Sequence, residues 1–299
     1  RAEFFTEFER FDRHVDKLQR ESGQRIDYVS ICSPNYLHDA HIRFALRIGA
    51  DAICEKPVVL NPWNLDALQT VSEETMRTVH VILQLRLHPM IRRLKDYADT
   101  LPKGRRLSID LTYVTPRGRW YLTSWKGDVS KSGGLTTNIG VHLFDALRWI
   151  FGEVTESVVH VSEATSAAGM LELDKARVRW FLSVDERDLP HTTNSRKTKA
   201  WRAITVEGKE LAFTDGFENL HTESYRAILD GRGFGLRDAK AAIEIISQIR
   251  SAKPIGIKGY CHPMLQDSMH PRSASDWGLP REPSDDVARP AWRFCHVEA

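Results

Sequence analysis

The strongest constraint on the fold comes from residues 26–85, where short apolar runs alternate with segments whose apolar residues recur at helical spacing. Strands separated by single helices pair in parallel through right-handed crossovers. The sequence therefore predicts an open α/β sheet that binds ligands beyond the carboxyl ends of its strands. The predicted strands are 26–32, 51–57 and 78–85, and the predicted helices are 36–50 and 62–76.

Polar and apolar residues alternate with a period of two in many segments beyond residue 87. Such alternation is typical of an antiparallel sheet with one covered face. Further helices are expected at 88–99, 135–152, 218–230 and 237–251. We predict that residues 1–86 form a truncated Rossmann-type parallel-sheet domain, which lacks its first strand–helix units. An α+β substrate and oligomerisation domain with a large, mostly antiparallel sheet should follow at 87–264. The Pro-, Ser- and charge-rich residues 265–299 are predicted to be a disordered tail.

The composition excludes several classes of protein. With 299 residues and a formal net charge of +2, the chain shows no basic footprint for nucleic acid. No apolar run approaches the roughly 20 residues of a membrane span, so we expect a cytoplasmic protein with no membrane partner. The four cysteines form no CxxC pair; no metal site is expected, and Cys32 and Cys54 are predicted to be small buried thiols.

Charged residues stand where the second predicted strand ends. Glu55, Lys56 and Pro57 follow the apolar residues 51–54, and burying charges is costly unless they are paired or used. One interpretation is a strand-end salt bridge followed by a turn proline. The other is that Lys56 projects into a cleft, where an ammonium beside a substrate hydroxyl stabilises developing negative charge or transfers a proton.

Asn138, His142 and Asp145 lie at i, i+4 and i+7 of the predicted helix 135–152, so we expect them to share one face. A histidine on a helix is most often a packing residue. Here, however, polar residues interrupt an otherwise apolar helix that is preceded by two glycines, which allow close approach to a ligand. Since histidine is the natural base near neutral pH, we expect His142 to act in catalysis.

The loop 117–131 combines four cations, three aromatic residues and several hydroxyls. Alone it is typical of an exposed loop, but a long loop before a catalytic helix commonly recognises substrate. Its arginines and lysines suit a carboxylate or a diphosphate. Five histidines lack comparable context and are interpreted as surface or packing residues; they are His14, His80, His160, His191 and His221.

The glycines provide no dinucleotide fingerprint. Such a sheet normally opens with a strand, GxGxxG and a helix, and none of the eighteen glycines stands in that arrangement. Either the fold binds no dinucleotide, or its first strands precede this chain. The start at Arg1, within helix-like sequence, favours the second explanation.

Three motifs in order resemble the Gfo/Idh/MocA family of NAD(P)-dependent sugar oxidoreductases over roughly residues 1–264. The motifs are Ser33-Pro34-Asn35 with His38, Glu55-Lys56-Pro57, and the stretch from Asn138 to Asp145 that contains Gly140 and His142. The resemblance implies NAD as the cofactor, with NADP as an alternative. It implies cofactor contacts from Ser33, Pro34, Asn35, His38, Glu55, Lys56 and Gln84. The implied catalytic residues are Lys56 and His142. The implied substrate-binding residues are Lys56, Arg117, Arg119, Trp125, Lys126, Lys131, Asn138 and His142.

Within the family, residues 55–68, 124–145 and 257–263 resemble the subgroup that oxidises a UDP-linked N-acetylglucosaminuronic acid at C3 for bacterial O-antigen lipopolysaccharide. This resemblance implies a nucleotide-sugar substrate, with 2-oxoglutarate recycling the cofactor. His142 would take the hydroxyl proton while Lys56 hydrogen-bonds the same oxygen; which of them is the formal base stays open. Asn138 would orient the sugar.

Two alternatives stay open: another sugar or inositol dehydrogenase that uses NAD(P), or a non-catalytic fragment that only scaffolds. A homo-oligomer, dimer or tetramer, is expected because Val178, Trp180 and Leu182 form an apolar stripe on the predicted sheet that would need covering.

Overall fold

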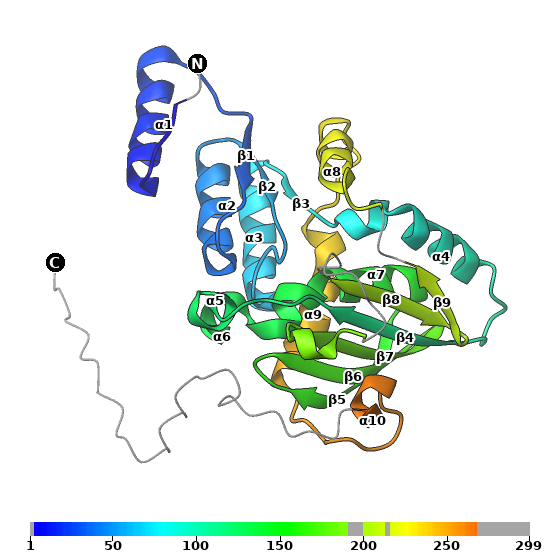
Figure 1. The fold of residues 1–299 in the computed structure, drawn as a ribbon. Coiled ribbons are helices and arrows are strands. Elements are labelled where there is room, and N and C mark those ends of the chain that lie inside the picture. Colours follow the sequence, from blue (N-terminus) through cyan, green and yellow to red (C-terminus); the bar gives the residue numbers. More distant parts are fainter. Residues whose placement is uncertain (1–2, 191–199, 213–215, 268–299) are drawn as a thin grey trace. The chain divides into compact units, whose positions relative to one another are not determined.

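The predicted parallel sheet is present in the computed structural model as three strands in the order β1–β2–β3 (Figure 1). The strands are β1 (Tyr28–Ile31), β2 (Asp51–Cys54) and β3 (Val79–Val81). The structure describes residues 3–190, 200–212 and 216–267. The predicted tail at 265–299 therefore lies almost entirely outside the described residues.

Helices connect these strands as the alternating pattern predicted: η1 (Asn35–Leu37) and α2 (His38–Arg47) lie between β1 and β2, and α3 (Pro62–Thr75) lies between β2 and β3. Helix α1 (Phe8–Ser22) precedes β1, and η2 (Gln84–Leu87) follows β3. Proline at the first position of α3 lacks only an N–H that the helix leaves unpaired, so it suits this place. The third strand ends at Val81 instead of residue 85, because the last part of that apolar run forms the 3₁₀ turn η2. Leu83 and Leu85 are buried here, and a short apolar run is equally typical of a buried strand, so the pattern could not separate the two conformations.

The second sheet has six strands in the order β5–β6–β7–β4–β8–β9. Only the β4–β7 pair is parallel, and the other pairs are antiparallel, which confirms the predicted fold class. The strands are β4 (Leu107–Val114), β5 (Val154–Ser162), β6 (Ser166–Leu173), β7 (Ala176–Ser183), β8 (Trp201–Val206) and β9 (Lys209–Ala212).

The remaining helices all follow the parallel sheet along the chain. They are α4 (Pro89–Asp99), α5 (Trp120–Thr123), α6 (Val129–Ser132), the π-helical turn η3 (Thr136–Gly140), α7 (Val141–Phe151), η4 (Glu186–Asp188), α8 (Leu220–Leu229), α9 (Leu236–Ser251) and α10 (Pro263–Asp267). The first half of α9 packs in the core of the parallel sheet through Leu236 and Ile243. Its second half packs in the large core through Ile246 and Ile249, so α9 belongs to both cores.

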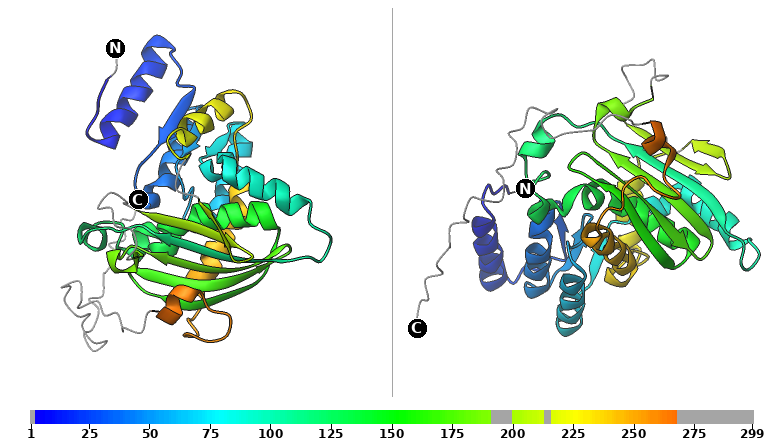
Figure 2. Two further views of the ribbon diagram at one scale, coloured as in Figure 1. Left: turned by 45° about the vertical axis from the view of Figure 1, so that its right-hand side comes forward. Right: turned by 90° about the horizontal axis from the view of Figure 1, so that it is seen from below.

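Helix α7 lies on one face of the six-stranded sheet, and the segment with α10 lies on the other (Figure 2). Phe144 of α7 meets Trp180 edge-on, with ring centroids 5.3 Å apart. Val178, Trp180 and Leu182 are fully buried in this core. The stripe that predicted an oligomer interface is therefore covered by the protein's own helix, and the homo-oligomer stays a prediction without support from these residues.

Helix α8 follows the second sheet in sequence but packs on the first. Ile228 of α8 clusters with Ile53 and Ile82, which belong to or follow the parallel strands. The Tyr225 hydroxyl lies 2.5 Å from Ser30 Oγ of β1. This packing brings the beginning of α8 to the carboxyl ends of the parallel strands. Among the described residues, no helix is both long and apolar enough to span a membrane.

Candidate active site

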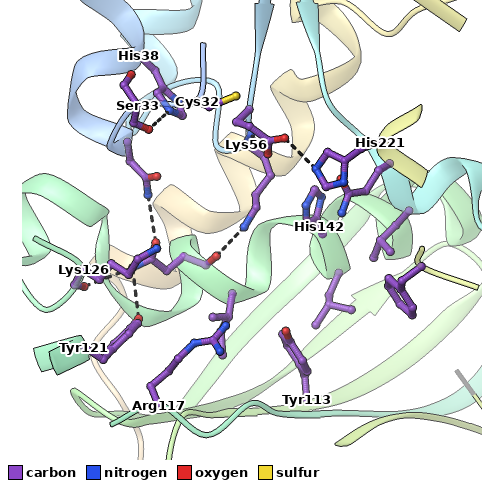
Figure 3. A pocket seen from close by; sticks show the side chains of 18 of the residues that line it. Cys32, Ser33, His38, Lys56, Tyr113, Arg117, Tyr121, Lys126, His142 and His221 are labelled. Atoms are coloured by element: carbon purple, nitrogen blue, oxygen red, sulfur yellow. Dashed lines mark hydrogen bonds and ion pairs between the residues drawn. The ribbon is translucent and has the colours of Figure 1, made fainter. Parts of the chain in front are cut away.

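A cavity of about 390 Å³ opens at the carboxyl ends of β1 and β2 and extends over the six-stranded sheet (Figure 3). Most of the predicted site residues line it. They are Ser33, Asn35, His38, Glu55, Lys56, Gln84, Arg117, Trp125, Lys126, Asn138 and His142. Pro34, Arg119 and Lys131 are outside the lining, and Lys131 pairs with Asp128 at 3.4 Å instead. The site roles of these three residues stay predictions.

Lys56 leaves the end of β2 and reaches the helix that carries His142. Its Nζ donates a hydrogen bond to the Asn138 carbonyl of η3 at 2.9 Å. The pKa of Lys56 is lowered to about 8, mainly by burial; the charge of Glu55 opposes this shift, and the charges of Lys126 and Arg117 contribute to it. A lysine with this pKa can exchange a proton near neutral pH, as a general acid or base requires.

His142 stands at the second position of α7, directly after the π-helical turn η3. The turn ends at Gly140, where a Cβ would come within 2.8 Å of Leu182 Cδ1, so glycine lets this backbone lie close to β7. Burial lowers the pKa of His142 well below its usual value, and the charges of Lys56 and His221 act in the same direction. Among the described residues, nothing partners its buried Nδ1. His142 is therefore a neutral imidazole that can accept a proton.

Asp145 does not share the cavity with His142. It is 2% exposed, and its carboxylate accepts hydrogen bonds from Arg86 at 2.6 and 3.0 Å. The expectation that Asn138, His142 and Asp145 share one face is therefore wrong. Asp145 comes three residues after His142 within the regular helix α7, which places it about 60° around the helix axis from His142 and directs its carboxylate towards Arg86. Asp145 instead fixes α7 to η2 beneath the site.

Several predicted cofactor contacts also hold the loops of the site. Both ring nitrogens of His38 face carbonyl oxygens, Nδ1 that of Pro57 at 2.7 Å and Nε2 that of Ser33 at 2.8 Å. These contacts join the loops that follow β1 and β2. Gln84, in contrast, has a buried Oε1 without a partner in the described part of the chain, so it can accept a hydrogen bond from a ligand.

Asn138 uses its side chain within the protein. Its Oδ1 accepts from Asn35 Nδ2 at 3.3 Å, and its Nδ2 lies 3.3 Å from both the Tyr121 hydroxyl and the Lys126 carbonyl oxygen. The amide thus connects the loop after β1 with α5 and the loop that follows it. Orientation of a sugar by Asn138 stays a prediction.

Several residues that line the cavity were not predicted from the sequence. His221, interpreted as a surface or packing residue, is exposed as that interpretation predicts. It also lines the cavity and lies 2.9 Å from Glu55 Oε1, because α8 folds back onto the first sheet. Cys32, expected to be buried, is exposed, whereas Cys54 is buried as predicted. The other missed residues with polar or aromatic side chains are Tyr113, Tyr121, Arg202 and Phe217. No local pattern distinguishes them: Tyr113 and Arg202 lie in strands of the second sheet, and Tyr121 lies in the short helix α5.

The cavity carries an excess of positive charge. Lys56, Arg117, Lys126 and Arg202 line it, whereas Glu55 is the only acidic residue among the described lining residues. Arg202 lies over the rings of Tyr113 and Phe217, with its guanidinium carbon 5.0 and 4.5 Å from their centroids. A cavity with this charge favours an anionic ligand.

Two family models match the chain. Residues 1–83 match the Gfo/Idh/MocA oxidoreductase family model for an NAD-binding Rossmann fold. Residues 104–214 match the model for the C-terminal alpha/beta domain of the same oxidoreductase family.

Two solved structures with 45% and 46% sequence identity to this chain have a similar fold. The WlbA (WbpB) dehydrogenase from Thermus thermophilus, in complex with NAD and UDP-GlcNAcA, is 46% identical with a TM-score of 0.82. The match covers 88% of this chain and 84% of that one. The same enzyme in complex with NAD and alpha-ketoglutarate is 45% identical over the same shares, with a TM-score of 0.83.

Curated relatives match over shorter stretches. The inositol 2-dehydrogenase of Rhizobium meliloti is 29% identical over 55% of this chain and 46% of its own length. The D-apiose dehydrogenase of Paraburkholderia graminis is 26% identical over 51% of this chain and 42% of its own length. The chain thus spans less than half the length of these curated relatives.

Proposed function

The chain belongs to the Gfo/Idh/MocA family of oxidoreductases, and from this premise we propose that it oxidises the C3 hydroxyl of a UDP-linked N-acetylglucosaminuronic acid to the 3-keto sugar with NAD. The observation that carries the proposal is one cationic cavity that holds both Lys56 and His142. The similarity to a dehydrogenase complex with NAD and UDP-GlcNAcA supports this choice of substrate.

The residues that line the cavity fit the nicotinamide end of NAD. Gln84 offers a buried acceptor without a partner in the described structure, and Ser33 and Lys56 line the same cavity. The turns that follow β1, β2 and β3 contain no glycine, so these turns offer no diphosphate cradle of the GxGxxG kind. When bound, NAD supplies the carbon that accepts the hydride from C3 of the sugar.

Lys56 and His142 have different roles at the sugar C3 oxygen. His142 is neutral because of its burial and the neighbouring cations, so it takes the proton of the C3 hydroxyl. Lys56 is mostly an ammonium at pH 7, since its pKa is about 8, and it donates a hydrogen bond to the oxygen as negative charge develops. This division assigns His142 as the base, because an ammonium has no lone pair with which to accept a proton.

The remaining cations select the substrate. Arg117, Lys126 and Arg202 line the cavity and provide partners for the uronate carboxylate and the diphosphate. The dicarboxylate 2-oxoglutarate suits the same charges, and its keto group, taking up a hydride and a proton, returns the cofactor to NAD. We assign the product to the synthesis of precursors for bacterial O-antigen in the cytoplasm, where nucleotide sugars are used.

A second candidate is an inositol or simple sugar dehydrogenase. It is favoured by the matches to inositol 2-dehydrogenase and D-apiose dehydrogenase. Such substrates are neutral, however, and leave the cations of the cavity without partners. A non-catalytic scaffold is the third candidate.

A substrate panel tests these candidates. The purified protein is incubated with NAD, 2-oxoglutarate and, in turn, UDP-N-acetylglucosaminuronic acid, myo-inositol and D-apiose, and the products are identified by mass spectrometry. We expect a loss of two hydrogens from the UDP-sugar only. Turnover of a neutral sugar alone would establish the second candidate, and no turnover at all would favour the scaffold.

The variant His142→Asn tests the base. Since a general base contributes about 10²- to 10⁴-fold, we expect turnover to fall by that factor while thermal unfolding stays unchanged. His14→Asn is the matched control, because His14 pairs with Glu3 of the N-terminal segment. Full activity of His142→Asn would remove His142 from the reaction.

A further inference from the structure

The hydroxyl of Tyr121 is a polar group of the cavity that the proposed reaction does not yet use. Tyr121 lies in the short helix α5, is 3% exposed, and lines the cavity together with Arg117 and Lys126 (Figure 3). It belongs to the loop 117–131, for which substrate recognition was predicted from the cations and Trp125.

A chain of hydrogen bonds that begins at a backbone carbonyl fixes the direction of the amides next to Tyr121. The Ser132 carbonyl can only accept, so the group that faces it at 2.9 Å must be the amide nitrogen of Asn35. The same nitrogen lies 3.3 Å from Asn138, which must therefore present its Oδ1. The orientation of Asn138 follows from that of Asn35.

A second backbone carbonyl fixes the direction at the other end of this series of hydrogen bonds. The Asn138 amide nitrogen lies 3.3 Å from the Lys126 carbonyl oxygen, which again can only accept. That nitrogen also lies 3.3 Å from the Tyr121 hydroxyl, so the phenolic oxygen accepts in this contact. A reversed Asn138 amide would place its carbonyl oxygen against the Lys126 carbonyl oxygen and its nitrogen against the Asn35 donor. The direction is therefore determined from both ends.

The hydroxyl of Tyr121 can therefore still donate its proton in a hydrogen bond. A phenol donates one hydrogen bond, and no acceptor for it is found within the described ranges 3–190, 200–212 and 216–267. Burial raises the pKa of Tyr121, so the hydroxyl keeps its proton. The cavity is the place where an acceptor can reach it, and Arg117 acts on the same hydroxyl electrostatically.

We propose that Tyr121 is a substrate-binding residue that donates its hydroxyl proton to a carboxylate oxygen of the ligand, beside the cations Arg117 and Lys126. A carboxylate is the acceptor that these two cations also favour. This assignment rests on the proposed function, since the uronate carboxylate is the acceptor in that substrate.

The variant Tyr121→Phe tests the proposal, because it removes one hydroxyl and keeps the ring. Binding is measured by calorimetry in the presence of NADH with two probes, UDP-N-acetylglucosaminuronic acid and UDP-N-acetylglucosamine, which lacks the carboxylate. A hydrogen bond to a charged acceptor corresponds to about 10- to 100-fold in Kd. We expect that loss for the acid and a change within about twofold for the neutral sugar.

The control is Tyr97→Phe, at a half-exposed tyrosine of α4 outside the cavity, which should bind both probes like the wild type. Equal weakening of both probes by Tyr121→Phe would show a loosened Asn138 network or a contact with a shared part of the ligands, and would overturn the proposal. Unchanged binding of the acid would overturn it as well. Failure of the wild type to bind the acid would instead refute the proposed function.

Discussion

His262 should make the protein less stable in mildly acidic solution. The side chain is 2% exposed and stacks on Phe181, with ring centroids 5.7 Å apart. Its Nδ1 accepts from the Met264 N–H at 3.2 Å, so Nε2 carries the proton and donates to Thr112 Oγ1 at 3.2 Å. The ring is therefore held neutral, and it fastens the segment before α10 to the six-stranded sheet.

The magnitude follows from the pKa of this histidine. The pKa of His262 is lowered from 6.5 to about 4, mainly by burial; the charge of Asp110 opposes this shift, and the charge of Arg179 contributes to it. At 1.36 kcal/mol for each unit, the difference corresponds to about 3 kcal/mol. Because the pKa is lower in the folded than in the unfolded state, the unfolded chain binds the proton first. The stabilisation is complete above pH 6.5 and is lost as the pH falls towards 4.

The assay is urea unfolding of the wild type and His262→Asn at several values between pH 7 and pH 4. Asparagine can still accept from the Met264 N–H but does not titrate. Across this range, we expect the wild type to lose about 3 kcal/mol more than the variant. His14→Asn should follow the wild type. Parallel pH dependences of the wild type and His262→Asn would refute the reasoning, whatever their difference in stability at pH 7.

Two further predictions concern Lys56 and Arg86. Because the pKa of Lys56 is about 8 and its ammonium is the active form, kcat/KM should fall above about pH 8. The charge of Lys126 lowers the pKa of Lys56, so Lys126→Met should move this fall to higher pH. A fall at the same pH in both proteins would contradict the assignment. Arg86→Met leaves the buried Asp145 unpaired and should lower the free energy of unfolding by about 3 to 5 kcal/mol, measured by urea unfolding. Arg86→Met with Asp145→Leu should recover part of this loss, and equal stability of the single and double variants would contradict the explanation.

Much of the site followed from local patterns. The alternation of apolar runs and helical segments predicted parallel strands, and such strands end at one edge of a sheet. The sequence alone therefore required Ser33, Glu55 and Lys56 to lie close together. His142 was also predicted, because a polar residue at a fixed position of an apolar helix is visible in the sequence.

Other parts needed the folded structure. A spacing of i, i+4, i+7 could not show that Asp145 faces Arg86 instead of the cavity, since Asp145 lies about 60° around α7 from His142 and the position of Arg86 depends on the fold. The stripe of Val178, Trp180 and Leu182 showed that one face is apolar, but not whether a helix of the same chain or another subunit covers it.

The sequence by itself determined the element types, the strand ends that carry the reactive lysine, and the helix that carries the imidazole, because these depend on residues close together in the chain. Only the tertiary structure decided that Tyr121, Arg202 and His221 meet those residues in one cavity. These side chains come from a short helix after one strand of the second sheet, from another strand of that sheet, and from a helix that folds back onto the first. Their meeting depends on how whole layers pack, and no spacing along the chain records that.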